Sequence, residues 1–238
     1  MEKLFGNNLM RLVMVLLTIV STNVWSENID SELNSAADKG NFSLVKKILD
    51  SKTIERDALH TAFWIAVKKG NPAIIERFLQ AGVDFNLRAG NSYTPLRQVA
   101  RDGRDQVVEL LLAAGADVNA VSDEKDTALI LASEKDRRKV VALLLAANAD
   151  VNARRNNGMS ALLLAAQEGH QQTIQALIKA KADVNSQLEN GATPLMLAAQ
   201  HGHLGAVHSL IAANADLNLK ASNGMTALML ANLYRYKE

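Results

Sequence analysis

The chain has 238 residues, with 26 basic and 25 acidic side chains and a formal net charge of +1 at pH 7. Nucleic-acid-binding proteins normally carry a basic face or stripe, whereas the basic residues here alternate with acids, as in residues 101–105 and 134–139. We therefore expect solvated surface charge and no nucleic-acid partner. The absence of cysteine excludes disulfides, a thiol nucleophile and a lipid-modified N-terminal cysteine.

The first 26 residues have the layout of a secretory signal peptide. Lys3 and Arg11 supply positive charge, an apolar run of nine follows at residues 12–20, and Ser26 lies where small residues precede a cleavage site. An uncleaved membrane anchor is the alternative, but a span needs about 20 apolar residues. We expect cleavage near Ser26, no stable membrane insertion afterwards and a periplasmic location in a Gram-negative bacterium, with secretion outside the cell as an alternative.

From residue 31 onward the sequence repeats itself every 33 residues. A self-similar period of this length indicates a repeat array, in which each unit buries its apolar faces against its neighbours. Two series carry the period. The hydroxyl residues are Thr61, Thr94, Thr127, Ser160, Thr193 and Thr226, and the Asp-x-Asn pairs lie at 84/86, 117/119, 150/152, 183/185 and 216/218.

Each period predicts two helices with defined ends. The hydroxyl residue caps the first helix, and Pro95 and Pro194 occupy a first helical position, where a missing N–H is harmless. A glycine-centred break and a second apolar helix follow. Residues after the second helix that are expected to need a left-handed backbone are Gly82, Gly115, Asn148, Lys181 and Asn214. The Asp-x-Asn pairs then satisfy backbone groups in turns, because carboxylates one repeat apart lack the clustered oxygens of a calcium site.

The segment 191–218 resembles a known family. Its residues Thr193, Pro194 and Leu195, the pair Ala198 and Ala199, Gly202, His203 and the run 215–218 match the ankyrin repeat position by position. The resemblance covers roughly residues 31–236. It implies an all-α ankyrin-repeat solenoid of helix-turn-helix units with hairpin loops, acting as a binding scaffold for another protein. We place a signal peptide at 1–26, an N-terminal capping repeat at 27–57, core repeats at 58–225 and a C-terminal half-repeat cap at 226–238.

Two departures from the family pattern give further predictions. Lys125 and Asp136 stand where other repeats have glycine, so the repeat that contains them is expected to be the weakest joint. Mostly apolar contact between helices is expected to replace the hydrogen bonds of the histidine that the family has after Thr-Pro-Leu. No repeat keeps it; the residues there are Trp64, Arg97, Ile130, Leu163, Met196 and Met229. Weak self-association through the C-terminal residues Leu233, Tyr234 and Tyr236 is the alternative to a closed C-terminal cap.

The sequence predicts no catalytic, cofactor or metal site. His201, His203 and His208 are close together, but their spacing does not follow the i, i+4 pattern of metal-binding helices. His170 and His203 match the family's structural Gly-His position. There is no nucleophile elbow and no phosphate loop, so the protein is not expected to be an enzyme.

Stacking should leave the hairpin tips and one face of the first helices free on a concave surface. The chain is therefore predicted to be a non-catalytic protein-binding scaffold. An inhibitor or accessory subunit of another exported enzyme and a self-assembling structural element are the alternatives. Tyr93, Arg101 and Met159 are the preferred anchors, because aromatic residues, arginine and methionine are enriched in interface cores. The candidate partner-binding residues are Arg88, Tyr93, Arg101, Asp126, Glu134, Arg154, Met159, Gln167, Glu168, Gln200, His201 and Met225.

Overall fold

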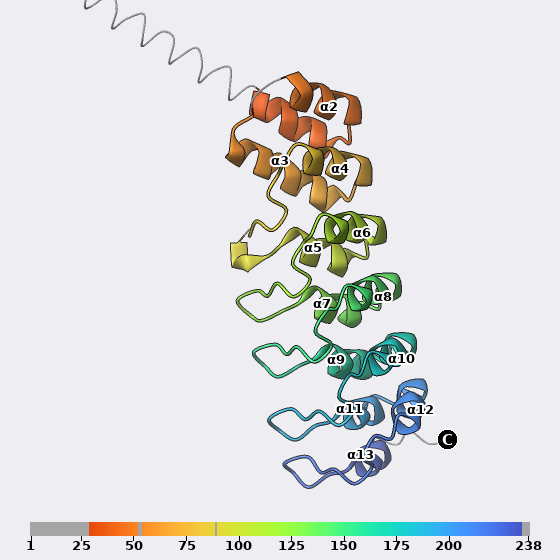
Figure 1. Ribbon diagram of the computed structural model, residues 1–238. Coiled ribbons are helices and arrows are strands. Elements are labelled where there is room, and N and C mark those ends of the chain that lie inside the picture. The colour runs from red at the N-terminus through yellow and green to blue at the C-terminus, as the bar shows by residue number, and fades with distance from the viewer. Residues whose placement is uncertain (1–28, 52–53, 89, 235–238) are drawn as a thin grey trace, which may run out of the picture. The chain divides into compact units, whose positions relative to one another are not determined.

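The protein is described by a computed structural model, which covers residues 29–51, 54–88 and 90–234 (Figure 1). These residues divide into two compact units, the first ending at Asp84 and the second beginning at Phe85. The predicted signal peptide at 1–26 and Tyr236 lie outside the described residues. Within the described part of the chain, no helix has the length and apolar character needed to cross a membrane.

Unit 1 is a small helical stack. It contains a helix over 29–38, α2 (Phe42–Ser51), α3 (Arg56–Lys69) and α4 (Pro72–Gln80), with α4 packed against both α2 and α3. The rings of Phe63 and Phe78 are fully buried and lie 5.9 Å apart between centroids. Asn71 caps α4 by accepting a hydrogen bond from the Ile74 N–H at 3.3 Å. Aromatic packing between α3 and α4 thus forms the centre of this unit.

The prediction that Thr61 caps a helix is wrong. Helix α3 begins five residues earlier, with Glu55 in the N-cap position, and runs through Thr61. The Thr61 hydroxyl donates to the Asp57 carbonyl at 2.8 Å, as hydroxyls inside helices often do. Residues 56–60 contain neither glycine nor proline, so no residue in this stretch interrupts the helix.

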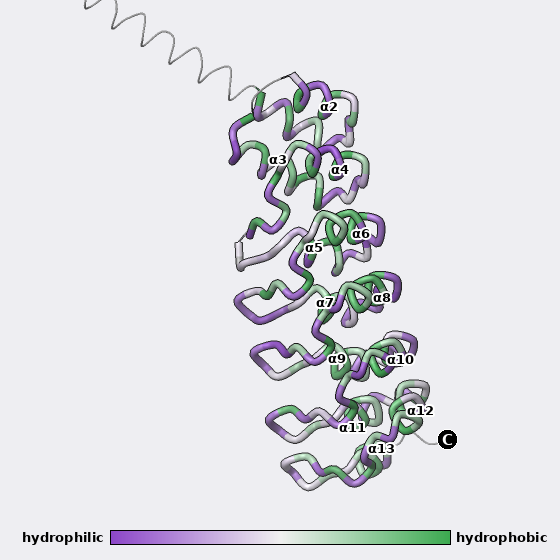
Figure 2. The backbone as a smooth tube through the Cα atoms, in the orientation of Figure 1, coloured by the Kyte–Doolittle hydropathy of each residue, from purple (hydrophilic) through white to green (hydrophobic). Residues whose placement is uncertain are grey.

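Unit 2 is a solenoid of helix pairs, each preceded by a hairpin loop (Figure 1). First helices stack on first helices and second helices on second helices. In Figure 2 the hydrophilic stretches concentrate in the hairpin loops and the apolar stretches in the helices. The first helices are α5 (Pro95–Asp102), α7 (Ala128–Glu134), α9 (Ala161–Glu168), α11 (Pro194–Gln200) and α13 (Ala227–Leu233); the second helices are α6 (Asp105–Ala113), α8 (Arg138–Ala146), α10 (Gln171–Lys179) and α12 (Leu204–Ala212). A short 3-10 helix, η1 (Gly90–Ser92), lies in the first of the hairpin loops.

The predicted helix ends of unit 2 are confirmed. Each hydroxyl from Thr94 to Thr226 accepts the N–H three residues later, for example Ile130 to Thr127 at 3.2 Å. Pro95 and Pro194 open their helices. All five residues predicted to be left-handed after second helices, including Gly82 in unit 1, have positive φ, with values from 60° to 92°.

The Asp-x-Asn pairs link each repeat to the next. The Asp150 N–H donates to the Asn119 side-chain oxygen at 2.8 Å, and the Asn152 N–H donates to the Asp150 carboxylate at 2.9 Å. The same inter-repeat bond recurs at residues 117, 183 and 216. The Asp residues from 117 to 216 therefore close their own turns, and the Asn residues from 86 to 185 accept a backbone N–H from the next repeat.

The repeat around Thr127, with the hairpin loop before it, has the two left-handed residues that the sequence predicts. Lys125 has φ 59° and is exposed, while Asp136 has φ 50°. The Asp136 carboxylate also accepts a hydrogen bond from the Thr173 hydroxyl at 2.8 Å, which offsets part of its backbone strain. Ser92, which aligns with Lys125 one repeat earlier, is left-handed too, with φ 55°, and was not predicted. The softness of this repeat and the division into capping and core repeats stay predictions.

Candidate functional site

A hollow of about 560 Å³ lies among the hairpin loops and first helices of unit 2. We call it the polar hollow. Its walls come from successive repeats: the loop before α5 and the end of α5, the loop before α7, the C-terminal half of α7 with the residue that follows it, and the loop before α9. Four predicted partner-binding residues line it, and five further residues were missed. The lining residues are Tyr93, Arg101, Glu124, Asp126, Leu131, Glu134, Lys135, Arg155 and Asn157.

Arg155 holds the polar hollow together. Its guanidinium donates to the carboxylates of both Asp126 and Glu134, and the three side chains are only 17–23% exposed. The sequence had pointed instead to its neighbour Arg154. Arg154 is exposed, and its guanidinium donates to the backbone carbonyls of Gly158 at 3.2 Å and Gln187 at 2.9 Å. Adjacent residues on an extended strand point to opposite sides, so the hairpin directs Arg155 toward the hollow.

The ion pair in the polar hollow is maintained at neutral pH. Burial alone would raise the pKa of Glu134, but hydrogen bonds from Arg155 and then Lys135 outweigh it and hold that pKa below its ordinary value. Burial alone would lower the pKa of Arg155, but its bond to Glu134 and the charge of Asp126 raise it. The Lys135 ammonium lies 3.0 Å from the Glu134 carboxylate. These charges are fixed in place before any partner arrives.

Comparison with known proteins agrees with this architecture. A family model that describes three consecutive ankyrin repeats matches the chain over four overlapping ranges, residues 33–122, 63–155, 100–188 and 162–238. The chain belongs to the ankyrin-repeat family. No curated protein matches it. Ankyrin-repeat proteins are typically non-catalytic scaffolds that mediate protein–protein interaction. We therefore interpret the polar hollow as part of a protein-binding surface.

One repeat replaces the family's histidine with a charged side chain and is the exception to the mostly apolar contact that we expected. Ile130 is buried as expected, but Arg97 is a buried arginine, only 1% exposed. Its guanidinium donates to the Ser92 carbonyl at 2.9 Å, and its central carbon lies 4.2 Å from the centroid of the Tyr93 ring. Burial lowers the pKa of Arg97. Stacking on a planar cation fixes the Tyr93 ring at the rim of the polar hollow.

The histidines of the family's Gly-His position connect neighbouring ankyrin repeats. The Nε2 of His203 lies 2.9 Å from the Gln167 carbonyl, and that of His170 lies 3.1 Å from the Glu134 carbonyl. Arg137 occupies the equivalent position in the preceding repeat, and its Nε donates to the Arg101 carbonyl at 3.1 Å. In the described residues no three His, Asp or Glu side chains are grouped so that they could hold a metal ion.

The prediction that Met159 is exposed on the partner-binding surface is wrong. It is 9% exposed, because it directly precedes the capping residue Ser160, where the hairpin turns into the buried first helix. The seven remaining candidates do not line the polar hollow: Arg88, Arg154, Glu168 and His201 are exposed, and Gln167, Gln200 and Met225 are half-buried. Tyr93 and Arg101 thus remain as anchor candidates. A hydrogen bond with Tyr93 raises the pKa of Arg101 and ties the two side chains together.

Proposed function

We propose that this ankyrin-repeat chain is a non-catalytic scaffold that binds another protein through the face of unit 2 that carries the polar hollow. The observation that supports it best is the convergence of side chains from successive repeats around Arg155. Interfaces gain specificity from charged groups held in fixed positions. The ion pair supplies such groups, because its carboxylates and guanidinium orient one another before binding.

A protein segment suits the polar hollow better than a small molecule. Sites for small molecules are enclosed and lined mainly by apolar side chains. Leu131 is the one aliphatic residue among those lining the polar hollow, and most of the others are charged. Arg101 and Lys135, each about half exposed, offer donors to acidic or carbonyl groups of the partner, while Tyr93 offers an aromatic surface.

We also propose that the protein acts in the periplasm, with secretion outside the cell as the alternative. The support is the sequence of residues 1–26, with its basic start and its short apolar run. The partner would then be another exported protein. If that partner is an enzyme, the same face would serve an inhibitor or accessory subunit, and assaying the enzyme with and without the scaffold distinguishes these roles from passive binding.

The test begins with affinity capture from periplasmic extract and mass spectrometry. Binding of the captured partner is then measured to a Tyr93→Ala, Arg101→Ala double variant. We expect a loss of at least about tenfold in affinity, as for removal of central interface anchors. The matched control changes Lys139 and Gln175 to alanine, which are exposed residues on second helices. Normal binding by the double variant together with loss of affinity in the control, both folded by circular dichroism, would show that the proposed face is wrong.

A further inference from the structure

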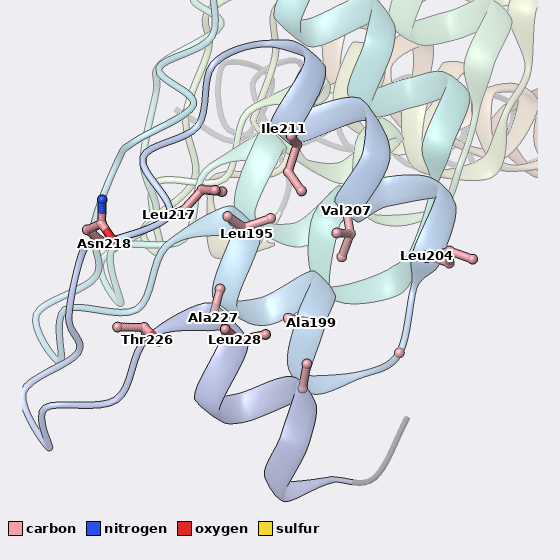
Figure 3. A pocket seen from close by; sticks show the side chains of 12 residues that line it. Leu195, Ala199, Leu204, Val207, Ile211, Leu217, Asn218, Thr226, Ala227 and Leu228 are labelled. Carbon is pink, nitrogen blue, oxygen red and sulfur yellow. The ribbon is translucent and has the colours of Figure 1, made fainter. Parts of the chain in front are cut away.

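Two hollows of unit 2 differ in the chemistry that they offer to a ligand. One lies between α11, α12 and α13, has a volume of about 730 Å³, and is lined by side chains such as Leu195, Ile211 and Leu228 (Figure 3). None of its lining residues is charged, so it selects no particular ligand. The polar hollow is different, because Tyr93 at its rim stacks on a buried arginine, Arg97.

Arg97 has a buried charge without a directly bonded counterion. It is 1% exposed, and its Nη1 donates to the Ser92 carbonyl at 2.9 Å. Its Nε and Nη2 are buried and have no hydrogen-bond partner, and no other charged side chain in the described part of the chain has buried atoms left in this way. Buried polar groups are nearly always paired. The two nitrogens therefore indicate a group that comes from outside the chain.

The carboxylates whose charge reaches Arg97 are bonded to other groups. Asp126 accepts a hydrogen bond from Arg155, and the exposed Asp123 accepts one from the Ser92 hydroxyl at 2.7 Å. Burial lowers the pKa of Arg97, and the charges around it offset only part of this effect. A further negative charge at Arg97 would complete the compensation.

The free atoms of Arg97 match one kind of anion. Nε and Nη2 lie along the same edge of the guanidinium, with parallel N–H bonds, and this edge pairs with the two oxygens of a carboxylate. A neutral acceptor satisfies the N–H groups but leaves the charge uncompensated. In an unmodified protein, carboxylates are supplied by acidic side chains and by the C-terminus. The free edge therefore favours a carboxylate of the partner.

Tyr93 connects Arg97 to the polar hollow. Its ring centroid lies 4.2 Å from the central guanidinium carbon of Arg97, and the half-buried Tyr93 is itself one of the lining residues. Because the ring covers a face of the guanidinium, turning it aside opens Arg97 to the hollow. Arg101, about half exposed and hydrogen-bonded to Tyr93, supplies a second positive charge on this path.

We propose that the polar hollow recognises a carboxylate of the partner protein, which pairs with the free edge of Arg97. This inference rests on the proposed function and specifies the partner as one that presents an acidic side chain or a free C-terminus. A basic segment is less well served, because Arg155 already bonds two of the three carboxylates that line the hollow, Asp126 and Glu134. The third, Glu124, is exposed in the loop before α7.

The test is a ¹⁵N NMR titration of the full chain, in which the Arg97 Nε–H signal is identified by its loss in Arg97→Met. The probes are tripeptides with blocked ends and glutamate, glutamine or lysine between two glycines, a triglycine with a free C-terminal carboxylate, and inorganic phosphate. We expect the glutamate peptide to shift this signal and to bind at least about tenfold more tightly than the glutamine peptide. The triglycine shows which source of carboxylate, side chain or C-terminus, binds more tightly.

Two variants and a matched control separate recognition from a structural role. Arg97→Met removes a costly buried charge, so its urea midpoint should be no lower than that of wild type, while its affinity for the glutamate peptide should fall at least about tenfold. Arg138→Met removes an exposed guanidinium from α8 and should bind the peptide as wild type does. Glu124→Gln removes a like charge and should strengthen binding of the glutamate peptide.

Equal or absent shifts with the glutamate and glutamine peptides, tighter binding of the lysine peptide or of phosphate, or an Arg97→Met chain that is less stable than wild type yet binds the glutamate peptide normally would overturn the proposal. The captured partner separates this test from that of the proposed function. If it loses affinity for the Tyr93→Ala, Arg101→Ala variant but binds Arg97→Met as tightly as wild type, the face is right and the carboxylate assignment is wrong.

Discussion

Replacing Arg155 by methionine should destabilise unit 2 at neutral pH. Methionine keeps an apolar stem of similar length but removes the guanidinium that binds Asp126 and Glu134. The two carboxylates would then lie close together and largely buried, with only the half-exposed Lys135 ammonium left beside Glu134. Loss of the cation therefore matters more than loss of the hydrogen bonds alone.

The magnitude follows from the burial of the three side chains. Exposed ion pairs contribute about 0 to 1 kcal/mol, and removal of one partner from a fully buried pair costs about 3 to 5 kcal/mol. The side chains in the polar hollow are 17–23% exposed, which places the loss between these limits, at about 2 kcal/mol. At an m-value of about 2 kcal/mol per molar urea, the unfolding midpoint should fall by about 1 M.

The loss should also depend on pH. The pKa of Glu134 is lowered in the folded protein. The ionised Glu134 therefore makes its full contribution to the free energy of unfolding above the ordinary glutamate pKa of about 4.3. This contribution disappears as the pH falls through the lowered pKa. The difference in stability between wild type and Arg155→Met should therefore be constant from about pH 7 to 5 and shrink below about pH 4.

Urea titrations followed by circular dichroism at several pH values measure both effects. The control is a triple variant that combines Arg155→Met with Asp126→Asn and Glu134→Gln, which removes the charges together and should recover most of the lost stability. An unchanged midpoint for Arg155→Met at pH 7, or a difference from wild type that persists undiminished at the lowest pH, would refute the reasoning.

Three further predictions concern other parts of the chain. Lys125→Gly should stabilise unit 2 by about 1 kcal/mol, because glycine adopts the left-handed backbone at this position without strain. In wild type, amide exchange in residues 123–145 should be faster than in the next two repeats, and equal protection would argue against a weak joint there. Asn152→Ala should cost about 1 kcal/mol in urea unfolding, because the Asp183 N–H loses its acceptor, and a neutral result would contradict the inter-repeat role. N-terminal sequencing of exported protein should find a start near Glu27, whereas an intact first residue in the membrane fraction would favour the anchor.

The sequence alone determined most of the fold, because the helix ends of a repeat array are set by residues close to them in the chain. A hydroxyl before each first helix of unit 2, a proline in the first turn of two of them and a glycine or asparagine after most second helices act within a few residues of themselves. Where these signals are present, as at Thr193, Pro194 and Asn214, the helix ends lie where the pattern predicts. Thr61 shows the limit of this reasoning, because its hydroxyl falls in the series but nothing in residues 56–60 interrupts the helix.

The tertiary structure decided which side chains meet in the polar hollow. Tyr93, Arg101, Asp126 and Glu134 could be predicted as one surface from the 33-residue period, since equivalent positions in a solenoid face the same way. The choice of Arg155 over Arg154 could not, because the hairpin sends adjacent residues to opposite sides and only its register assigns each side. The burial of Met159 was equally hidden from the sequence, because exposure is set by packing between successive repeats and not by residue type.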